Sequence, residues 1–90
     1  MGRGKWEGWL RITDKKHPHM TRDTLHGVLL RAAAYNPTRG FTNEKAKSGK
    51  WQHFTIGRRP LLRRFEDEIF ELEMAGKVEV VIRPLAPPRR

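Results

Sequence analysis

Three short segments of the chain alternate between apolar and polar residues with a period of two, the repeat of a half-buried β-strand. They cover residues 6–13, 50–56 and 78–82. In the first, Trp9 falls on the side opposite to the other apolar residues, and in the second Trp51 shares a side with His53 and Thr55. The third is rich in β-branched residues and stops before Pro84, which breaks a strand. The pattern therefore predicts three strands.

Two longer segments repeat their apolar residues at the spacing of an α-helix. The first is predicted from Thr21, which can cap the helix, to Tyr35. The second begins at Pro60, because proline suits the first turn of a helix, and ends before Gly76, which suits the position after a helix end. Between the two, residues 40–50 are polar and lysine-rich, so we expect a mobile basic loop there.

These elements follow one another as strand, helix, strand, helix, strand within 90 residues. We expect one domain over residues 1–90, of the α+β class, in which two helices cover a small three-stranded sheet. A doubly wound α/β fold is disfavoured, because three strands make too small a sheet to bury both of its faces. Residues 1–5 are predicted to form a flexible basic arm, and the proline-rich residues 84–90 an extended tail.

Charge is distributed unevenly along the chain. Residues 1–65 hold fifteen Lys and Arg and four acids, whereas residues 66–82 hold six acids and Lys77 as their one cation. The net charge of the whole chain is +9. A field of this size attracts polyanions, so nucleic acid, either DNA or RNA, is the first partner to consider. We expect the cations to gather on one side of the folded molecule and the carboxylates on the other.

The predicted nucleic-acid site combines cations that bind phosphate with rings that stack on bases. Four arginines flank Pro60, at a predicted helix N-terminus whose backbone N–H groups favour phosphate. In the alternative interpretation, Arg63 pairs with Asp67, and Arg64 with Glu68, along the helix. The site residues are Arg58, Arg59, Arg63, Arg64, Lys45, Lys47, Lys50, Arg11, Trp9 and Trp51, and the terminal Arg3, Lys5, Arg89 and Arg90 add reach.

An acidic patch on the outer face of the second predicted helix is a candidate surface for a protein partner, although such a run is also typical of a solvated helix face. It comprises Glu66, Asp67, Glu68, Glu71 and Glu73.

A second functional hypothesis starts from the positively charged half of the chain. The basic half would dock onto an acidic protein surface, as a small phage inhibitor of a host nucleic-acid-processing machine would do. The small size of the chain suggests a bacterial or phage source.

The sequence does not point to catalysis. It has no cysteine, and its four histidines lack companions that would complete a zinc site, so neither a metal nor a cofactor is predicted. We find no combination of acid, base and nucleophile, and we expect a non-enzymatic protein.

No segment is apolar enough to span a membrane, which together with the lack of cysteine favours the cytoplasm. The sequence is compatible with a monomer or a homodimer.

Overall fold

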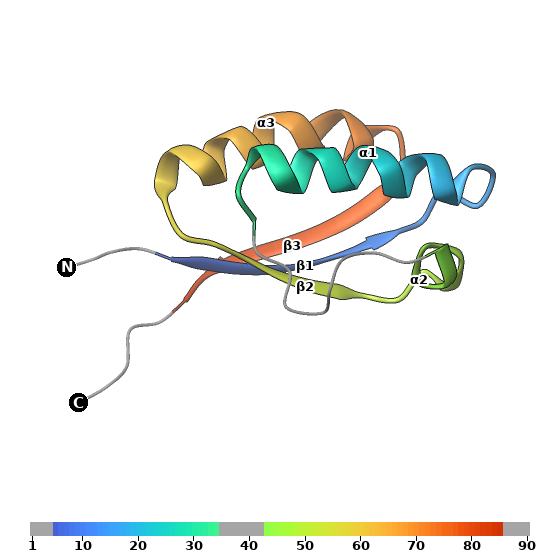
Figure 1. Cartoon of the computed structure of the whole chain (residues 1–90), viewed down its shortest axis with the longest axis horizontal. Coiled ribbons are helices and arrows are strands. Elements are labelled where there is room, and N and C mark those ends of the chain that lie inside the picture. The colour runs from blue at the N-terminus through green and yellow to red at the C-terminus, as the bar shows by residue number, and fades with distance from the viewer. Residues whose placement is uncertain (1–4, 35–42, 86–90) are drawn as a thin grey trace.

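The sheet is built around the first strand of the chain. The structure is a computed structural model, and it describes residues 5–34 and 43–85. Strands β1 (Trp6–Ile12), β2 (Gln52–Ile56) and β3 (Val78–Pro84) form an antiparallel sheet in the order β2-β1-β3 (Figure 1). β1 is therefore the central strand, and β3 forms one edge. The three predicted strands and the α+β class are confirmed.

Two long helices cover one face of the sheet. Helices α1 (Pro18–Arg31) and α3 (Arg59–Met74) lie side by side on that face (Figure 1). α3 forms as predicted, because Pro60 lies in its first turn and Gly76, with a φ of 74°, follows its end. Phe65 lies on the buried side of α3. The second face of the sheet points away from both helices.

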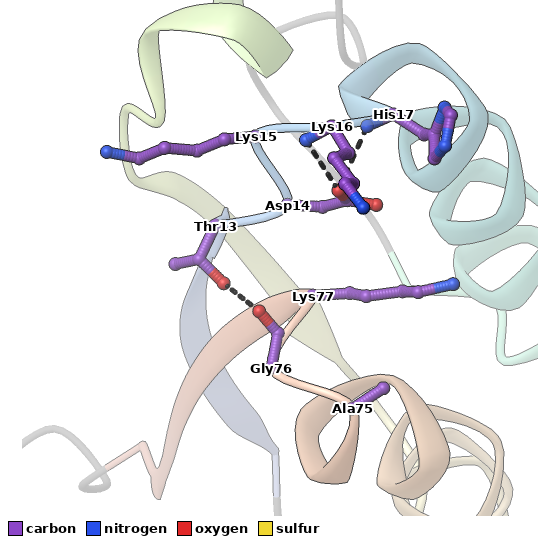
Figure 2. A pocket seen from close by; sticks show the side chains of 8 residues that line it. All are labelled: Thr13, Asp14, Lys15, Lys16, His17, Ala75, Gly76 and Lys77. Atoms are coloured by element: carbon purple, nitrogen blue, oxygen red, sulfur yellow. Dashed lines mark hydrogen bonds between the residues drawn. The ribbon is translucent and has the colours of Figure 1, made fainter.

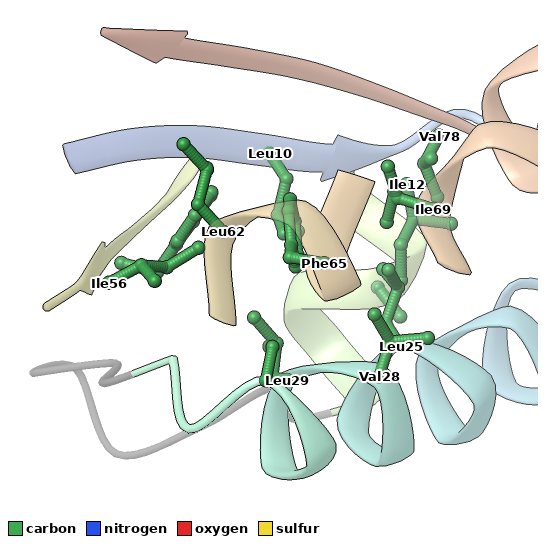
Figure 3. Packing of buried hydrophobic residues seen from close by; sticks show 13 residues of the cluster. Leu10, Ile12, Leu25, Val28, Leu29, Ile56, Leu62, Phe65, Ile69 and Val78 are labelled. Atoms are coloured by element: carbon green, nitrogen blue, oxygen red, sulfur yellow. The ribbon is translucent and has the colours of Figure 1, made fainter. Parts of the chain in front are cut away.

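The core fills the layer between the two long helices and the sheet (Figure 3). Phe54 of β2 and Phe65 of α3 meet there, with ring centroids 4.9 Å apart. Gly8 of β1 leaves room for this contact. A Cβ atom at Gly8 would lie 2.5 Å from the Phe54 ring and 2.7 Å from the backbone oxygen of Val81. The packing therefore requires a glycine at this position of the central strand.

Helix α1 begins earlier than the sequence predicts. It begins at Pro18 rather than at Thr21, and Thr21 is buried inside the helix. Asp14 explains the early start, because its carboxylate accepts two backbone N–H groups just before the helix, both at 3.0 Å, and the Thr21 hydroxyl at 2.8 Å. Proline is tolerated at the first helical position because its missing N–H would have no partner within the helix.

The segment between α1 and β2 differs most from the prediction. α1 ends at Arg31 rather than at Tyr35, because Ala33 takes a φ of 50°, which does not continue a right-handed helix. The predicted basic loop contains a short helix, α2 (Asn43–Ser48). α2 forms because Ala46 is small enough to pack into the core, where it is 3% exposed. The order of elements therefore contains a third helix that the sequence did not predict.

The sheet extends into both segments that were predicted to be loose. Pro84 pairs with Trp6 as the last residue of β3, and the N–H of Leu85 donates to the backbone oxygen of Lys5 at 2.8 Å. The prediction that the strand stops before Pro84 is therefore wrong. Proline is tolerated there because β3 is an edge strand, whose outward positions need no N–H partner. The rest of the predicted arm and tail lies outside the described residues.

Candidate nucleic-acid interface

The sheet face that points away from α1 and α3, here called the open face, carries the side chains that alternate with the core residues. It comprises Glu7, Trp9, Arg11, His53, Thr55, Glu79, Val81 and Arg83, together with Trp51 directly before β2, whose ring contacts Arg11. In the register of the sheet, Trp9 stands between His53 and Val81. The rows of Glu7 and Arg11 lie on either side of this central row. Trp9 therefore occupies the middle of the open face.

The Trp9 side chain has an aromatic neighbour on one side and a cation on the other. Its ring centroid lies 5.1 Å from that of His53, with the planes tilted by 55°. The guanidinium carbon of Arg83 lies 5.2 Å from the Trp9 ring centroid, which is a cation–π contact. Trp6 packs against the core instead. The two tryptophans thus lie on opposite faces of β1, as the alternation predicts.

A second cation–π contact lies at the start of β2. The guanidinium carbon of Arg11 is 5.0 Å from the ring centroid of Trp51, and Arg11 Nε donates to Glu79 Oε1 at 2.7 Å. Trp51 is 44% exposed. Trp51 precedes His53 by two residues, so it belongs to the same side of β2, as predicted. Arg11, Trp9 and Trp51, three of the predicted site residues, are therefore brought together by the fold.

The carboxylate of Glu7 holds one corner of the open face together. Its Oε1 lies 3.0 Å from Nε2 of His53, and its Oε2 accepts Arg83 Nε at 2.9 Å. Because an ionised carboxylate can accept but not donate, Nε2 is the donor in the first contact. The hydrogen bonds from His53 and then from Arg83 lower the pKa of Glu7 below its ordinary value. His53 and Arg83 were not among the predicted site residues, although both continue the alternation that contains Trp51 and Glu79.

Cations and carboxylates are mixed on the open face, and the predicted division of charge between two sides of the molecule is wrong there. Glu79 pairs with Arg11 and Glu7 pairs with Arg83, so the two guanidinium groups are matched by two carboxylates. The division fails because strand pairing joins residues 68 and 76 positions apart, which runs of charge along the sequence do not reveal. The rings, rather than an excess of cations, distinguish this face.

Of the four predicted phosphate-binding arginines, Arg59 and Arg64 make contacts that place them away from the open face. Arg59 places its guanidinium carbon 5.7 Å from the ring centroid of Trp6, on the helix side of the sheet. Arg64 donates to the backbone oxygen of Arg31 at 3.3 Å, at the end of α1. The predicted pairing of Arg64 with Glu68 is wrong, because Arg31 of α1 reaches Glu68 at 2.6 Å. The side chains of all four arginines, Arg58, Arg59, Arg63 and Arg64, are exposed.

A cluster of cations lies at the end of the sheet where β1 ends and β3 begins (Figure 2). A hollow of about 390 Å³ is lined there by Lys15, Lys16, His17 and Lys77, together with Thr13, Asp14, Ala75 and Gly76. The hydrogen bonds from His17, Thr21 and Lys16, and the charge of Lys77, lower the pKa of Asp14. The carboxylate of Asp14 already accepts the backbone N–H groups before α1. This cluster was not among the predicted site residues, although the Lys15-Lys16 pair before Pro18 was a signal for it in the sequence.

Of the remaining predicted residues, Lys47 lies near this cluster, because it lines a second hollow together with Lys16 and His17. Lys47 of α2 and Lys50 before β2 are exposed, and the side chain of Lys45 lies outside the described residues, as do the terminal Arg3, Arg89 and Arg90. Within the acidic patch, Glu68 is paired with Arg31, and the other four carboxylates are exposed. Burial, and then the charge of Glu66, raise the pKa of Glu73. The patch is therefore interrupted by one internal ion pair.

Within residues 5–34 and 43–85, no group of three or more His, Cys, Asp and Glu side chains is arranged to hold a metal ion. No helix in the same residues has the length and apolar character needed to cross a bilayer. Comparisons of the chain with protein-family models, with curated proteins and with solved structures find no match. Function must therefore be argued from the surface chemistry of the chain.

Proposed function

We propose that this protein binds single-stranded nucleic acid, DNA or RNA, across the open face and catalyses no reaction. The position of Trp9 in the middle of that face, with His53, Trp51 and two guanidinium groups around it, carries the proposal. Unpaired bases stack on aromatic rings and on guanidinium planes, whereas bases inside a duplex present only their edges. A sheet whose exposed face bears such groups favours a single strand with little sequence selectivity.

The ion pairs of the open face have a positioning role in this proposal. Glu7 and Glu79 hold the guanidinium groups of Arg83 and Arg11 over the two tryptophan rings. Their carboxylates also repel phosphate, so the backbone of the nucleic acid would be held elsewhere. Cations stand at both ends of the strands, with Lys5, Arg58 and Arg59 at one end and Lys15, Lys16, Lys50 and Lys77 at the other. These clusters would bind phosphates on either side of the stacked bases.

Binding can be measured by fluorescence anisotropy with labelled single strands of DNA and RNA and with a duplex of equal length. We expect the single strands to bind more tightly than the duplex, and Trp51→Ala to weaken their binding about tenfold, since each stacked base contributes roughly 1–3 kcal/mol. The matched control is Leu30→Ala, because Leu30 is another exposed apolar side chain but lies on α1. A lack of binding at low salt concentration would rule out the proposal.

The contribution of the cations can be measured separately by varying the salt concentration. Each phosphate contact that is lost reduces the slope of log affinity against log salt concentration by about 0.7 for a single strand. One variant replaces Lys5, Arg58 and Arg59 with glutamine, and a second replaces Lys15, Lys16 and Lys77 with glutamine. We expect both to flatten the slope without abolishing the effect of Trp51→Ala. An unchanged slope in both variants would show that neither cluster contacts phosphate.

An acidic protein surface is the alternative partner, and the lysine cluster favours it. Among the residues that line the hollow at Lys15, Lys16 and Lys77, the His17 imidazole is the one ring, so the hollow offers mainly charge. Such a surface matches carboxylates as well as phosphates. A protein complex of this kind should survive nuclease treatment and be lost when the three lysines are replaced by glutamine. If binding disappears with the nucleic acid, this alternative fails.

A further inference from the structure

Strand β3 forms one edge of the three-stranded sheet. The backbone oxygen of Lys77 accepts the N–H of Thr13, and the N–H of Leu85 donates to Lys5, each at 2.8 Å. Odd-numbered residues of β3 therefore direct their backbone groups toward β1, and the even-numbered ones direct theirs outward. Among the described residues no strand pairs with this outer side. An exposed edge of this kind can pair with another strand.

The sequence of β3 is complementary to itself in one antiparallel register. Residues directly opposite each other in two antiparallel strands place their side chains on the same face of the sheet. In a symmetric dimer the two-fold axis therefore passes beside one residue of β3, which faces its own copy, and each possible register is named by that central residue. Centring on Val81 sets Glu79 opposite Arg83 of a second copy, and Arg83 opposite its Glu79. Centring on Glu79 or on Arg83 sets like charges face to face. Centring on Val80 brings Lys77 opposite Arg83, and centring on Ile82 leaves Glu79 without a charged neighbour.

We propose that two copies of this chain join along β3 in the register centred on Val81, so that their sheets form one antiparallel sheet of six strands. Val80 of one copy would exchange two backbone hydrogen bonds with Ile82 of the other, and the symmetry repeats this pair. Val78 would donate to the oxygen of Pro84. The missing N–H of Pro84 then limits the pairing to the length of β3. The inference concerns the edge of the sheet and does not depend on nucleic-acid binding.

The open faces of the two copies would become continuous in this arrangement. Arg11 already pairs with Glu79, and Arg83 with Glu7. Joining the copies extends each pair into a row of alternating charge, from Arg11 and Glu79 of one copy to Arg83 and Glu7 of the other. The central row would run from Trp9 through the two Val81 side chains to the second Trp9. Val81 is 53% exposed in the single chain, and this contact would cover it.

The helix side of the same edge also offers apolar surface. A groove of about 310 Å³ lies between α3 and β3, lined by Glu66, Ile69, Phe70, Glu73, Val80 and Ile82. Phe70 is 58% exposed there. In the proposed register Val80 and Ile82 meet their counterparts on this side, so pairing covers apolar groups on both faces of the edge.

A pair of charge-reversal variants tests the register by sedimentation velocity in the absence of nucleic acid. The wild-type chain should reach twice its 10.6 kDa mass as its concentration rises. Glu79→Arg alone and Arg83→Glu alone each place like charges across the interface and should remain monomeric. Mixed in equal amounts, they should form the dimer again, because each Arg then faces a Glu. Each variant also loses one ion pair within its own chain. Mixing the variants cannot restore that pair, so a recovered dimer reports on the contact between the copies.

Two outcomes would overturn the proposal. One is a wild-type chain that stays monomeric up to its solubility limit, and the other is a mixture of the two variants that does not associate. Circular dichroism shows whether each variant is folded. Should either variant unfold, Val81→Lys provides a second test, since it sets two ammonium groups together on the axis and should abolish the dimer. Leu30→Lys, on α1, is its control and should leave the mass unchanged; a loss of the dimer in both would refute a specific β3 interface.

Discussion

The two faces of the sheet are built from alternate residues of the same strands, yet different forces organise them. The covered face buries Leu10, Phe54 and Ile56 under α1 and α3. On the open face, side chains such as Trp9 and Glu7 are held by cation–π contacts and ion pairs. Burial of apolar area supplies most of the stability of a small domain, whereas exposed ion pairs contribute little. The comparison indicates that the covered face specifies the fold. The residues of the open face are therefore not needed to form the core.

The largest effect is expected from truncating a helix residue that packs on the covered face. Phe65 is fully buried and contacts the Phe54 ring. Phe65→Ala should lower the free energy of unfolding by about 3–5 kcal/mol, the usual cost of deleting a buried aromatic ring. Urea denaturation at low protein concentration measures the change. Phe70→Ala, which removes an exposed ring from the same helix, should cost less than about 0.5 kcal/mol. Equal losses in the two variants would contradict the position assigned to the core.

A smaller loss is expected from adding a single methyl group on the covered face of β1. Gly8→Ala brings a Cβ atom against the Phe54 ring and the backbone of β3, and should cost about 1–3 kcal/mol. Thermal denaturation compares this variant with Gly57→Ala, where nothing lies within 4 Å of the added atom. The control should change the stability by less than about 0.5 kcal/mol. A tolerated Gly8→Ala would show that the Phe54 ring and the backbone of Val81 lie further from Gly8 than described.

Truncating a large ring on the open face should cost little stability. Trp51 is half exposed and contacts Arg11 by a cation–π interaction, which contributes about 0.5–1 kcal/mol. Trp51→Ala should therefore reduce the free energy of unfolding by about 1 kcal/mol or less, in contrast to Phe65→Ala. The same denaturation experiment measures both. A loss as large as that of Phe65→Ala would mean that Trp51 is part of the core and would make its binding test ambiguous.

Acid pH should affect the open face through Glu7. Its folded pKa lies below the ordinary value of 4.5, so the unfolded chain binds more protons in this range and the contribution of Glu7 to stability is lost as the pH falls below about 4.5. Glu7→Gln should therefore show a smaller drop in melting temperature between pH 7 and pH 3 than the wild type. Glu71→Gln, on the exposed side of α3, is the control. If the melting temperatures of wild type and Glu7→Gln fall equally between pH 7 and pH 3, the hydrogen bonds and ion pair assigned to Glu7 would be contradicted.

Local pattern was sufficient for the strands and for α3. A period of two places Trp9 and Trp51 on the open face without any knowledge of the fold, and Pro60 and Gly76 mark the limits of α3. The start of α1 was missed because Pro18 resembles a helix breaker until Asp14 is seen to accept the N–H groups before it. Helix α2 depends on tertiary packing, which a stretch of polar residues does not reveal.

The candidate site was only partly predictable for a related reason. Its rings follow from the alternation, but the contacts of Arg83 with Glu7 and of Arg11 with Glu79 depend on strand order and register. Neither is encoded in the spacing of residues along the chain. The runs of charge therefore pointed to the arginines of α3, whereas strand pairing gathers the rings and their cations on the other face of the sheet.

The three tryptophans allow the most direct test of whether the open face binds nucleic acid. Their indole N–H signals can be followed by NMR while a single-stranded oligonucleotide is added. Trp9 and Trp51 lie on the open face, and Trp6 packs on the helix side beside Arg59. Our account predicts that the signals of Trp9 and Trp51 shift with the oligonucleotide and that the signal of Trp6 moves little. Shifts confined to Trp6, or no shift in any of the three, would contradict it.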